Sequence, residues 1–124
     1  MDKILVINNE ESIRYLLDSL LSRTGYTVTL AASSREGLEL FRREHPDAVV
    51  LDLKTPVTDE LVIVQQIRLA NQKVPVIVLT STKILEMEQQ VLTSGVTEFI
   101  DKEFSLSRIV DSLKRHLNTA GTAM

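Results

Sequence analysis

Cysteine is absent from this sequence of 124 residues, which excludes a disulfide framework and a thiolate metal site. Long apolar runs are absent too. None approaches the roughly 20 residues that span a bilayer, so we expect no membrane segment. The first residues lead straight into a strand-like segment, which argues against a signal peptide. A chain without cysteine suits a reducing compartment, and we expect a cytoplasmic location.

An excess of one charge sign is also missing. The 14 basic and 17 acidic residues give a net charge of −3, and the signs are mixed, so we expect no direct binding of nucleic acid. The two histidines do not form a catalytic set. His45 precedes Pro46 in a predicted turn, and His116 lies near the end of the last predicted helix, where we expect a surface residue. No Gly-rich phosphate loop is present, and we expect a protein that is not an enzyme.

What the sequence does contain is a strict alternation of short apolar runs with amphipathic stretches. The runs are rich in β-branched residues, which is typical of buried strands, and the stretches repeat apolar residues at helical spacing. The predicted strands are Lys3–Ile7, Thr27–Ala31, Ala48–Leu53, Val76–Thr80 and Glu98–Asp101. The predicted helices are Glu11–Thr24, Ser33–Glu44, Asp59–Ala70, Ile84–Ser94 and one that starts near Ser105 and includes Leu117.

This alternation predicts an α/β fold with a doubly wound, five-stranded parallel sheet and helices on both faces. We expect one domain over residues 1–118, and a disordered tail or the start of a linker over residues 119–124. Local signals support the helices. Ser33 with Glu36 forms a capping-box pattern, Thr58 can cap the third helix, and Gly25 can end the first in a left-handed conformation.

Polar residues follow three of the predicted strands directly or end them. Asp52 ends a buried run, Thr80 ends the fourth strand, and Lys102 follows the fifth. Sheets of this kind place their sites at the carboxyl ends of the strands. A carboxylate there can attack phosphorus or bind a cation, and a hydroxyl and an ammonium can contact a phosphoryl group. Each residue alone could be an ordinary strand-end polar group, and their joint placement favours a phosphoryl site.

At this point the chain resembles a family. The segments that carry the resemblance are Lys3–Ser12, Asp52–Pro56, Val76–Ser81 and Phe99–Lys102, which are similar to the successive motifs of response-regulator receiver domains, the CheY-like domains of two-component signalling. The resemblance implies a flavodoxin-like sheet in the order 2-1-3-4-5. It also implies a phosphorelay function, with a histidine kinase or phosphotransfer protein upstream and an output domain or protein downstream.

The resemblance implies a role for each matching residue. Asp52 is the phosphoacceptor, and Thr80 and Lys102 contact the phosphoryl group. Phe99 takes the place of the switch aromatic that moves with Thr80; as an alternative it is a plain core residue.

Three residues depart from the family pattern around the metal. Asn8 and Asn9 stand where two acidic residues usually help to hold Mg²⁺, and an amide offers oxygen without charge. Lys54 supplies a backbone carbonyl, but its ammonium could bridge to Asp52 instead of extending into solvent. If Mg²⁺ binds, the implied ligands are Asp52, Asn9 and the Lys54 carbonyl, and we expect weak binding.

A further departure follows Lys102. Glu103 stands where the family usually has proline after a cis peptide bond. A cis bond before a residue other than proline costs about 2.5–4 kcal/mol, so we expect a trans Lys102–Glu103 bond.

Two other functions compete with the receiver. One is a pseudo-receiver that binds a partner constitutively, without Mg²⁺-dependent phosphorylation, as Asn8, Asn9 and Lys54 suggest. The other is a small phosphatase of the haloacid-dehalogenase type. That class needs a second aspartate where Lys54 stands, and the chain is short for such a fold.

Overall fold

The computed structural model describes residues 2–52, 59–80, 95–101 and 107–122. Within them, helices and strands alternate from β1 to β4 as the sequence predicts, and β5 and α6 follow. The strands are β1 (Lys3–Ile7), β2 (Thr27–Ala31), β3 (Ala48–Asp52), β4 (Val76–Thr80) and β5 (Glu98–Asp101). The helices are α1 (Glu11–Arg23), α2 (Ser34–Glu44), α3 (Asp59–Ala70) and α6 (Ser107–Thr122).

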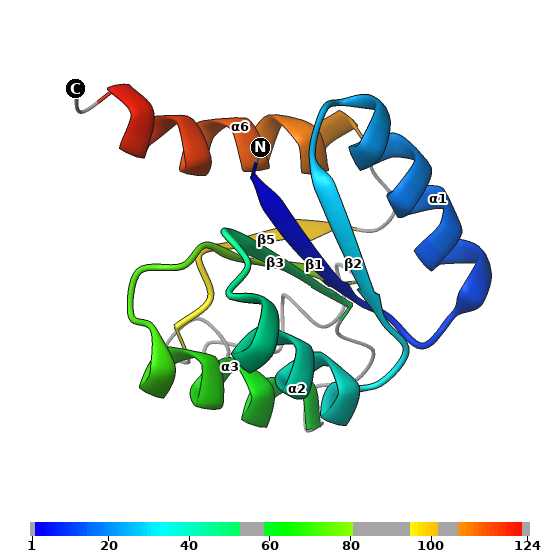
Figure 1. Cartoon of the computed structure of the whole chain (residues 1–124), viewed down its shortest axis with the longest axis vertical. Helices are drawn as coiled ribbons and strands as arrows, with labels where there is room; N and C mark the ends of the chain where they lie inside the picture. Colours follow the sequence, from blue (N-terminus) through cyan, green and yellow to red (C-terminus); the bar gives the residue numbers. More distant parts are fainter. Residues whose placement is uncertain (1, 53–58, 81–94, 102–106, 123–124) are drawn as a thin grey trace.

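The five strands form one parallel sheet in the order β2-β1-β3-β4-β5, which confirms the predicted fold class and strand order. Helices α1 and α6 cover one face of the sheet, and α2 and α3 cover the other (Figure 1). β3 lies in the centre, and all five of its residues are buried. The last residue of β3, Asp52, therefore lies in the middle of the side of the sheet where the strands have their carboxyl ends.

Two apolar layers hold the helices to the sheet. Successive strand residues enter opposite layers, because side chains alternate across a strand. The helix side chains buried in the layer under α2 and α3 are Phe41, Ile63, Val64 and Ile67. Those buried in the layer under α1 and α6 are Leu17, Leu21, Ile109 and Leu113.

The predicted helix boundaries have the expected chemistry. Ser33 Oγ accepts the Glu36 N–H at 3.1 Å, and Glu36 Oε1 accepts the Ala32 N–H at 2.6 Å, so both side chains of the capping box are used. Gly25 follows α1 with a φ of 106°, a conformation that favours glycine. His45 ends α2 in the left-handed region, directly before Pro46, in the turn that the sequence predicts.

The carboxyl-terminal helix differs from the prediction. α6 extends to Thr122 and so includes residues 119–122, which the sequence assigns to a tail. No proline interrupts this stretch, and Ala120 is a strong helix former. Four sequence predictions lie outside the described residues: the helix Ile84–Ser94, the strand end at Leu53, the helix cap at Thr58 and the helix start at Ser105. Among the described helices, none combines the length and apolarity of a membrane span.

Candidate functional site

The carboxyl ends of β1, β3, β4 and β5 meet at one edge of the sheet, which we call the rim. The strand partners that set the register there are Ile7 with Leu51, Asp52 with Leu79, and Thr80 with Asp101. Asn8 directly follows Ile7 and Asp52 directly follows Leu51, so continuing this register places Asn8 beside Asp52 at the rim. The register therefore brings together three of the residues that the sequence assigns to the site.

Asp52 is a buried carboxylate, with 5% of its surface exposed, at the end of the central strand. It lies two residues after Val50, which faces α1 and α6, so strand alternation directs Asp52 to the same side. Asn8 is 3% exposed and lies two residues after Val6, on that side too. The rim thus has a buried carboxylate beside a buried amide, both next to the start of α1.

The oxygen atoms of Asn8 are engaged in hydrogen bonds within the protein. Its side-chain Oδ1 accepts the Glu10 N–H at 2.7 Å, and its backbone carbonyl accepts a hydrogen bond from the Arg14 guanidinium at 2.7 Å. Its own N–H donates to the carbonyl of Ala31 at 3.0 Å. Asn9, in contrast, is exposed. Asn8 therefore stabilises the start of α1 through these hydrogen bonds.

The sequence predicts ligands for a divalent cation at the rim, and some of them lie among the described residues. The predicted ligands among them are the Asp52 carboxylate and the neutral amide of Asn9, with the neutral amide of Asn8 at the other acidic position of the family. Mg²⁺ is a hard cation that prefers charged oxygen ligands, and the Asn8 oxygen already accepts a hydrogen bond. Across the described residues, no group of three or more His, Cys, Asp and Glu side chains could hold a metal.

The remaining predicted site residues lie on β4, on β5 or outside the described ranges. Thr80 is the last residue of β4, as predicted. Phe99 lies in β5, half-buried against the layer under α2 and α3. Lys54, Lys102 and the Lys102–Glu103 bond lie outside the described residues.

Two residues at the rim, Asp101 and Arg14, were not predicted from the sequence. Asp101 is a second buried acid, 9% exposed, at the end of β5. It lies two residues after Phe99 and so on the opposite face from Asp52, which means that the two carboxylates do not form a pair. Arg14 approaches the rim from α1. The strand-end position of Asp101 was a readable signal, whereas the contact of Arg14 with Asn8 depends on how α1 packs.

His116 also differs from its prediction as a surface residue. Its Nε2 lies 2.9 Å from Glu98 Oε1, which also accepts the Ser112 hydroxyl at 2.7 Å, while Arg115 donates to Oε2 at 2.9 Å. These three donors lie on one side of α6, because residues i, i+3 and i+4 share a helix face. They anchor α6 to β5 through Glu98.

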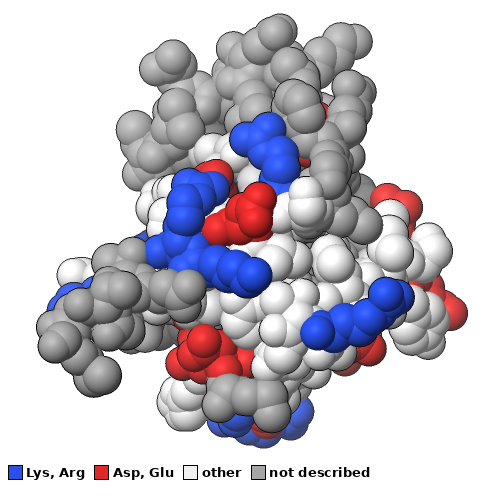
Figure 2. All heavy atoms as spheres, turned by 90° about the horizontal axis from the view of Figure 1, so that it is seen from above, with Lys and Arg blue, Asp and Glu red and all other residues white. Residues whose placement is uncertain are grey.

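The Glu98 carboxylate is strongly stabilised in its charged form. Burial raises the pKa of Glu98, but the hydrogen bonds from Ser112, His116 and Arg115 outweigh it and lower the pKa to about 2. Seen from the side of α1 and α6, basic side chains gather around acidic ones (Figure 2). This face mixes both signs, in agreement with the small net charge.

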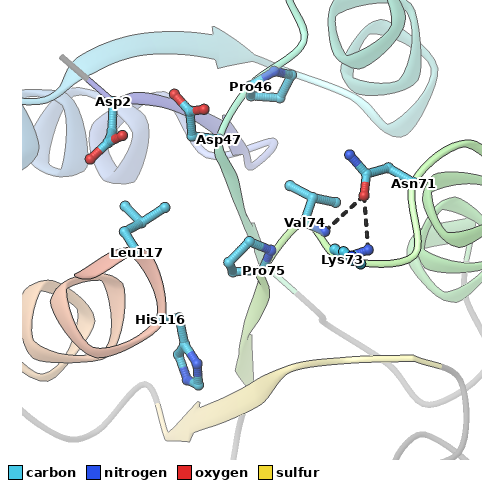
Figure 3. A pocket seen from close by; sticks show the side chains of 9 residues that line it. All are labelled: Asp2, Pro46, Asp47, Asn71, Lys73, Val74, Pro75, His116 and Leu117. Atoms are coloured by element: carbon cyan, nitrogen blue, oxygen red, sulfur yellow. Dashed lines mark hydrogen bonds between the residues drawn. The ribbon is translucent and has the colours of Figure 1, made fainter. Parts of the chain in front are cut away.

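A cavity of about 300 Å³ opens at the opposite edge of the sheet. Asp2, Asp47 and Pro75, which line it, directly precede β1, β3 and β4, and Lys73 and His116 border it (Figure 3). The Asn71 side chain beside it accepts the N–H groups of Lys73 and Val74. The cavity lies at the amino ends of the strands and is therefore separate from the rim.

The sheet order and the rim agree with the comparison of the chain with protein families. Residues 4–114 match the model of the response regulator receiver domain. The chain belongs to this family. Receiver domains are signalling modules and not enzymes; they receive signals from histidine kinases or phosphotransfer proteins, act on output domains, and in general use Mg²⁺ for phosphorylation. Membership confirms the resemblance, and it also argues against the phosphatase.

Relatives of two lengths match this receiver domain. The chain is 39% identical over 124 residues to the probable transcriptional regulator ycf27 of Porphyridium aerugineum, with 98% of the chain and 51% of the relative covered. It is 30% identical over 116 residues to sporulation initiation phosphotransferase F of Bacillus subtilis, with 94% of each covered. The chain thus spans about half of the first relative and nearly all of the second.

Solved structures show the same receiver fold. The crystal structure of a response regulator receiver domain protein from Clostridium thermocellum matches with a TM-score of 0.89 and 28% identity, and both chains are covered completely. The chemotaxis protein CheY4 of Vibrio cholerae matches with a TM-score of 0.84 and 28% identity, over 94% of this chain and 99% of that one.

Proposed function

We propose that this receiver domain accepts a phosphoryl group on Asp52 from a histidine kinase or phosphotransfer protein and switches an output domain or partner, with weakened dependence on Mg²⁺. Thr80 and Lys102 contact the phosphoryl group, and Phe99 is the switch aromatic. Residues 1–118 form the working unit, which acts in the cytoplasm and binds neither nucleic acid nor membrane itself.

One observation carries the proposal: Asp52 is a buried carboxylate at the end of the central strand, on an edge it shares with Thr80. A nucleophilic carboxylate needs a fixed position and exclusion of bulk water, and the rigid end of β3 supports both. Family membership and the register of the rim support the same assignment.

The weakened Mg²⁺ dependence is supported by the charges around Asp52. Neutral amides occupy positions 8 and 9, and the Asn8 oxygen accepts the Glu10 N–H. A unit charge pair about 4 Å apart is worth on the order of 4 kcal/mol at a surface-like dielectric. Two missing carboxylates therefore remove a large part of the attraction for a divalent ion.

Intact mass after incubation with acetyl phosphate, with and without Mg²⁺, tests the assignment of Asp52. We expect the mass of one phosphate on the wild type and none on Asp52→Asn. Asp101→Asn is the matched control, because it removes the other buried acid of the rim and should leave the phosphate in place. Phosphate that persists in Asp52→Asn, or that maps to another residue, would contradict the assignment.

The switch has its own test. If Phe99 responds to the phosphoryl group, phosphorylation should shift the resonances of Phe99 and of the other residues of β5. A response of this kind requires two states with different contacts. Shifts confined to the residues around Asp52 would show that Phe99 is an ordinary core aromatic, in agreement with its half-buried position.

The pseudo-receiver is the second candidate, and the hydrogen bonds of Asn8 favour it, because they assign that residue to the structure of α1. It predicts no phosphate on Asp52 with or without Mg²⁺, and a partner that binds the wild type and Asp52→Asn equally well. Phosphate-dependent binding would exclude it.

A further inference from the structure

Arg68, in the last turn of α3, connects three segments at the amino edge of the sheet. Its Nε donates to the carbonyl of Gly95 at 2.7 Å, and its two terminal nitrogens donate to the Asn71 carbonyl and to Thr97 Oγ1, each at 3.2 Å. A planar guanidinium can make several such bonds at once in a fixed geometry. Burial also lowers the pKa of Arg68, which reflects its partly enclosed position.

Thr97 connects Arg68 to the sheet, because it also forms hydrogen bonds with the backbone of β4. Its hydroxyl accepts the Val76 N–H at 2.9 Å, and its own N–H donates to the Val76 carbonyl at 2.8 Å. Thr97 directly precedes β5, and Phe99 follows two residues later. The start of β5 is therefore held to β4 by Thr97 and to α3 by Arg68.

Gly95 shows how closely Arg68 approaches this segment. Gly95 has a φ of 99°, and a Cβ built on it would lie 2.7 Å from Arg68 Cγ. A side chain at position 95 would displace the stem of Arg68, and only glycine suits both the backbone conformation and the contact. The loop before β5 and Arg68 thus fit each other as a pair.

We propose that Arg68 is the positioning residue for Phe99: it holds the start of β5 and couples that strand to α3. The inference rests on the proposed function, in which Phe99 is the switch aromatic and Asp52 the phosphoacceptor. α3 begins at Asp59, seven residues after Asp52, and ends at Ala70, two residues after Arg68. A displacement of α3 on phosphorylation therefore reaches β5 through the two hydrogen bonds of Arg68 to Gly95 and Thr97.

The first experiment uses the unphosphorylated domain. We compare Arg68→Gln and Arg68→Lys with the control Arg23→Gln, whose guanidinium donates to Ser19 on its own helix. Hydrogen exchange of the Thr97 amide and the Phe99 resonances are measured, together with global stability by urea unfolding. We expect at least tenfold faster Thr97 exchange in Arg68→Gln than its global stability explains, a smaller effect in Arg68→Lys, and none in Arg23→Gln. Unchanged Thr97 exchange and Phe99 resonances in Arg68→Gln would overturn the inference.

The second experiment adds acetyl phosphate and measures the phosphate on Asp52 by intact mass. We expect the same occupancy within twofold in wild type and Arg68→Gln, because Arg68 lies at the opposite edge from the rim, but a Phe99 response reduced by at least half. An undiminished response at equal occupancy would overturn the coupling. If the wild type takes no phosphate, the proposed function fails, and the first experiment alone decides whether Arg68 positions β5. If Arg68→Gln does not fold, Arg68→Lys decides both experiments with the smaller expected effect, because it keeps the charge but lacks the planar guanidinium that bonds three groups at once.

Discussion

The side-chain oxygen of Asn8 accepts the backbone N–H of Glu10 at 2.7 Å, one residue before α1 begins. Glu10 occupies the N-cap position of α1 and makes no side-chain capping bond of its own. Asn8 therefore supplies, from the end of β1, the acceptor that the start of this helix needs. Asn8 thus stabilises the start of α1 and also lies at the rim beside Asp52.

Removing the Asn8 amide should destabilise the domain. We expect Asn8→Ala to lower the free energy of unfolding by about 1–2 kcal/mol, the usual effect of losing a capping acceptor. Asn8→Asp keeps an acceptor and should retain most of that stability. Urea unfolding of both variants measures the difference. Equal stability of Asn8→Ala and the wild type would show that the bond to Glu10 contributes nothing.

Restored carboxylates should strengthen Mg²⁺ binding. We expect Asn8→Asp with Asn9→Asp to raise the Mg²⁺ affinity at least tenfold, or about 1.4 kcal/mol, and added Lys54→Met to raise it further. Without metal, repulsion of Asp52 should cost some stability, which Mg²⁺ then recovers. Calorimetry and thermal shift measure both effects.

The control for this series is Gln65→Glu with Gln72→Glu, which adds two charges at exposed positions away from the rim. It should leave the Mg²⁺ affinity nearly unchanged. Equal and substantial affinity in the wild type and the triple variant would show that amide oxygens suffice, and the domain would then be an ordinary Mg²⁺-dependent receiver.

The Glu98 contacts should make stability depend on acid pH. Because the pKa of Glu98 is about 2 in the folded state and near its usual value of 4.5 in the unfolded chain, its contribution is complete above about pH 4.5. It is lost as the pH falls from there towards 2. We expect Glu98→Gln to cost about 1–2 kcal/mol at pH 7 and progressively less between pH 4.5 and 2.

Urea unfolding at several pH values checks this difference, with the exposed Glu39→Gln on α2 as the control. The control should parallel the wild type at every pH. A Glu98→Gln deficit that stays constant from pH 7 to 2.5 would mean that the Glu98 charge does not hold α6 to β5.

Two glycines with similar backbone conformations distinguish the cost of a strained backbone from the cost of a steric clash. Gly25 and Gly95 have φ values of 106° and 99°, but a Cβ at Gly25 meets nothing within 4 Å, whereas one at Gly95 meets Arg68. Gly25→Ala should cost about 1–2 kcal/mol, from the left-handed backbone alone. Gly95→Ala should cost clearly more. If thermal and urea unfolding gave the same loss for both, Arg68 would have room to move aside.

The sequence by itself determined the fold and which of its strand-end residues lie at the rim. Strand and helix periods are local properties, so the bounds of β1, β2, β4 and β5 agree with those predicted. Strict alternation then leaves one topology class, in which the carboxyl ends of the strands share an edge. The sequence alone therefore assigns Asn8, Asp52 and Thr80 to one end of the sheet, whereas the assignments of Lys54 and Lys102 stay predictions.

Only the tertiary structure decided which groups these residues contact. Arg68 meets Gly95 and Thr97 across 27 and 29 residues of sequence, and Glu98 meets its donors on α6 across 14 to 18. Periodicity tells which face of a helix is buried, but not which carbonyl or carboxylate lies opposite a given side chain. That choice depends on the offset and packing of whole elements, which is why Arg68 and the partners of Glu98 could not be read from the pattern of residues.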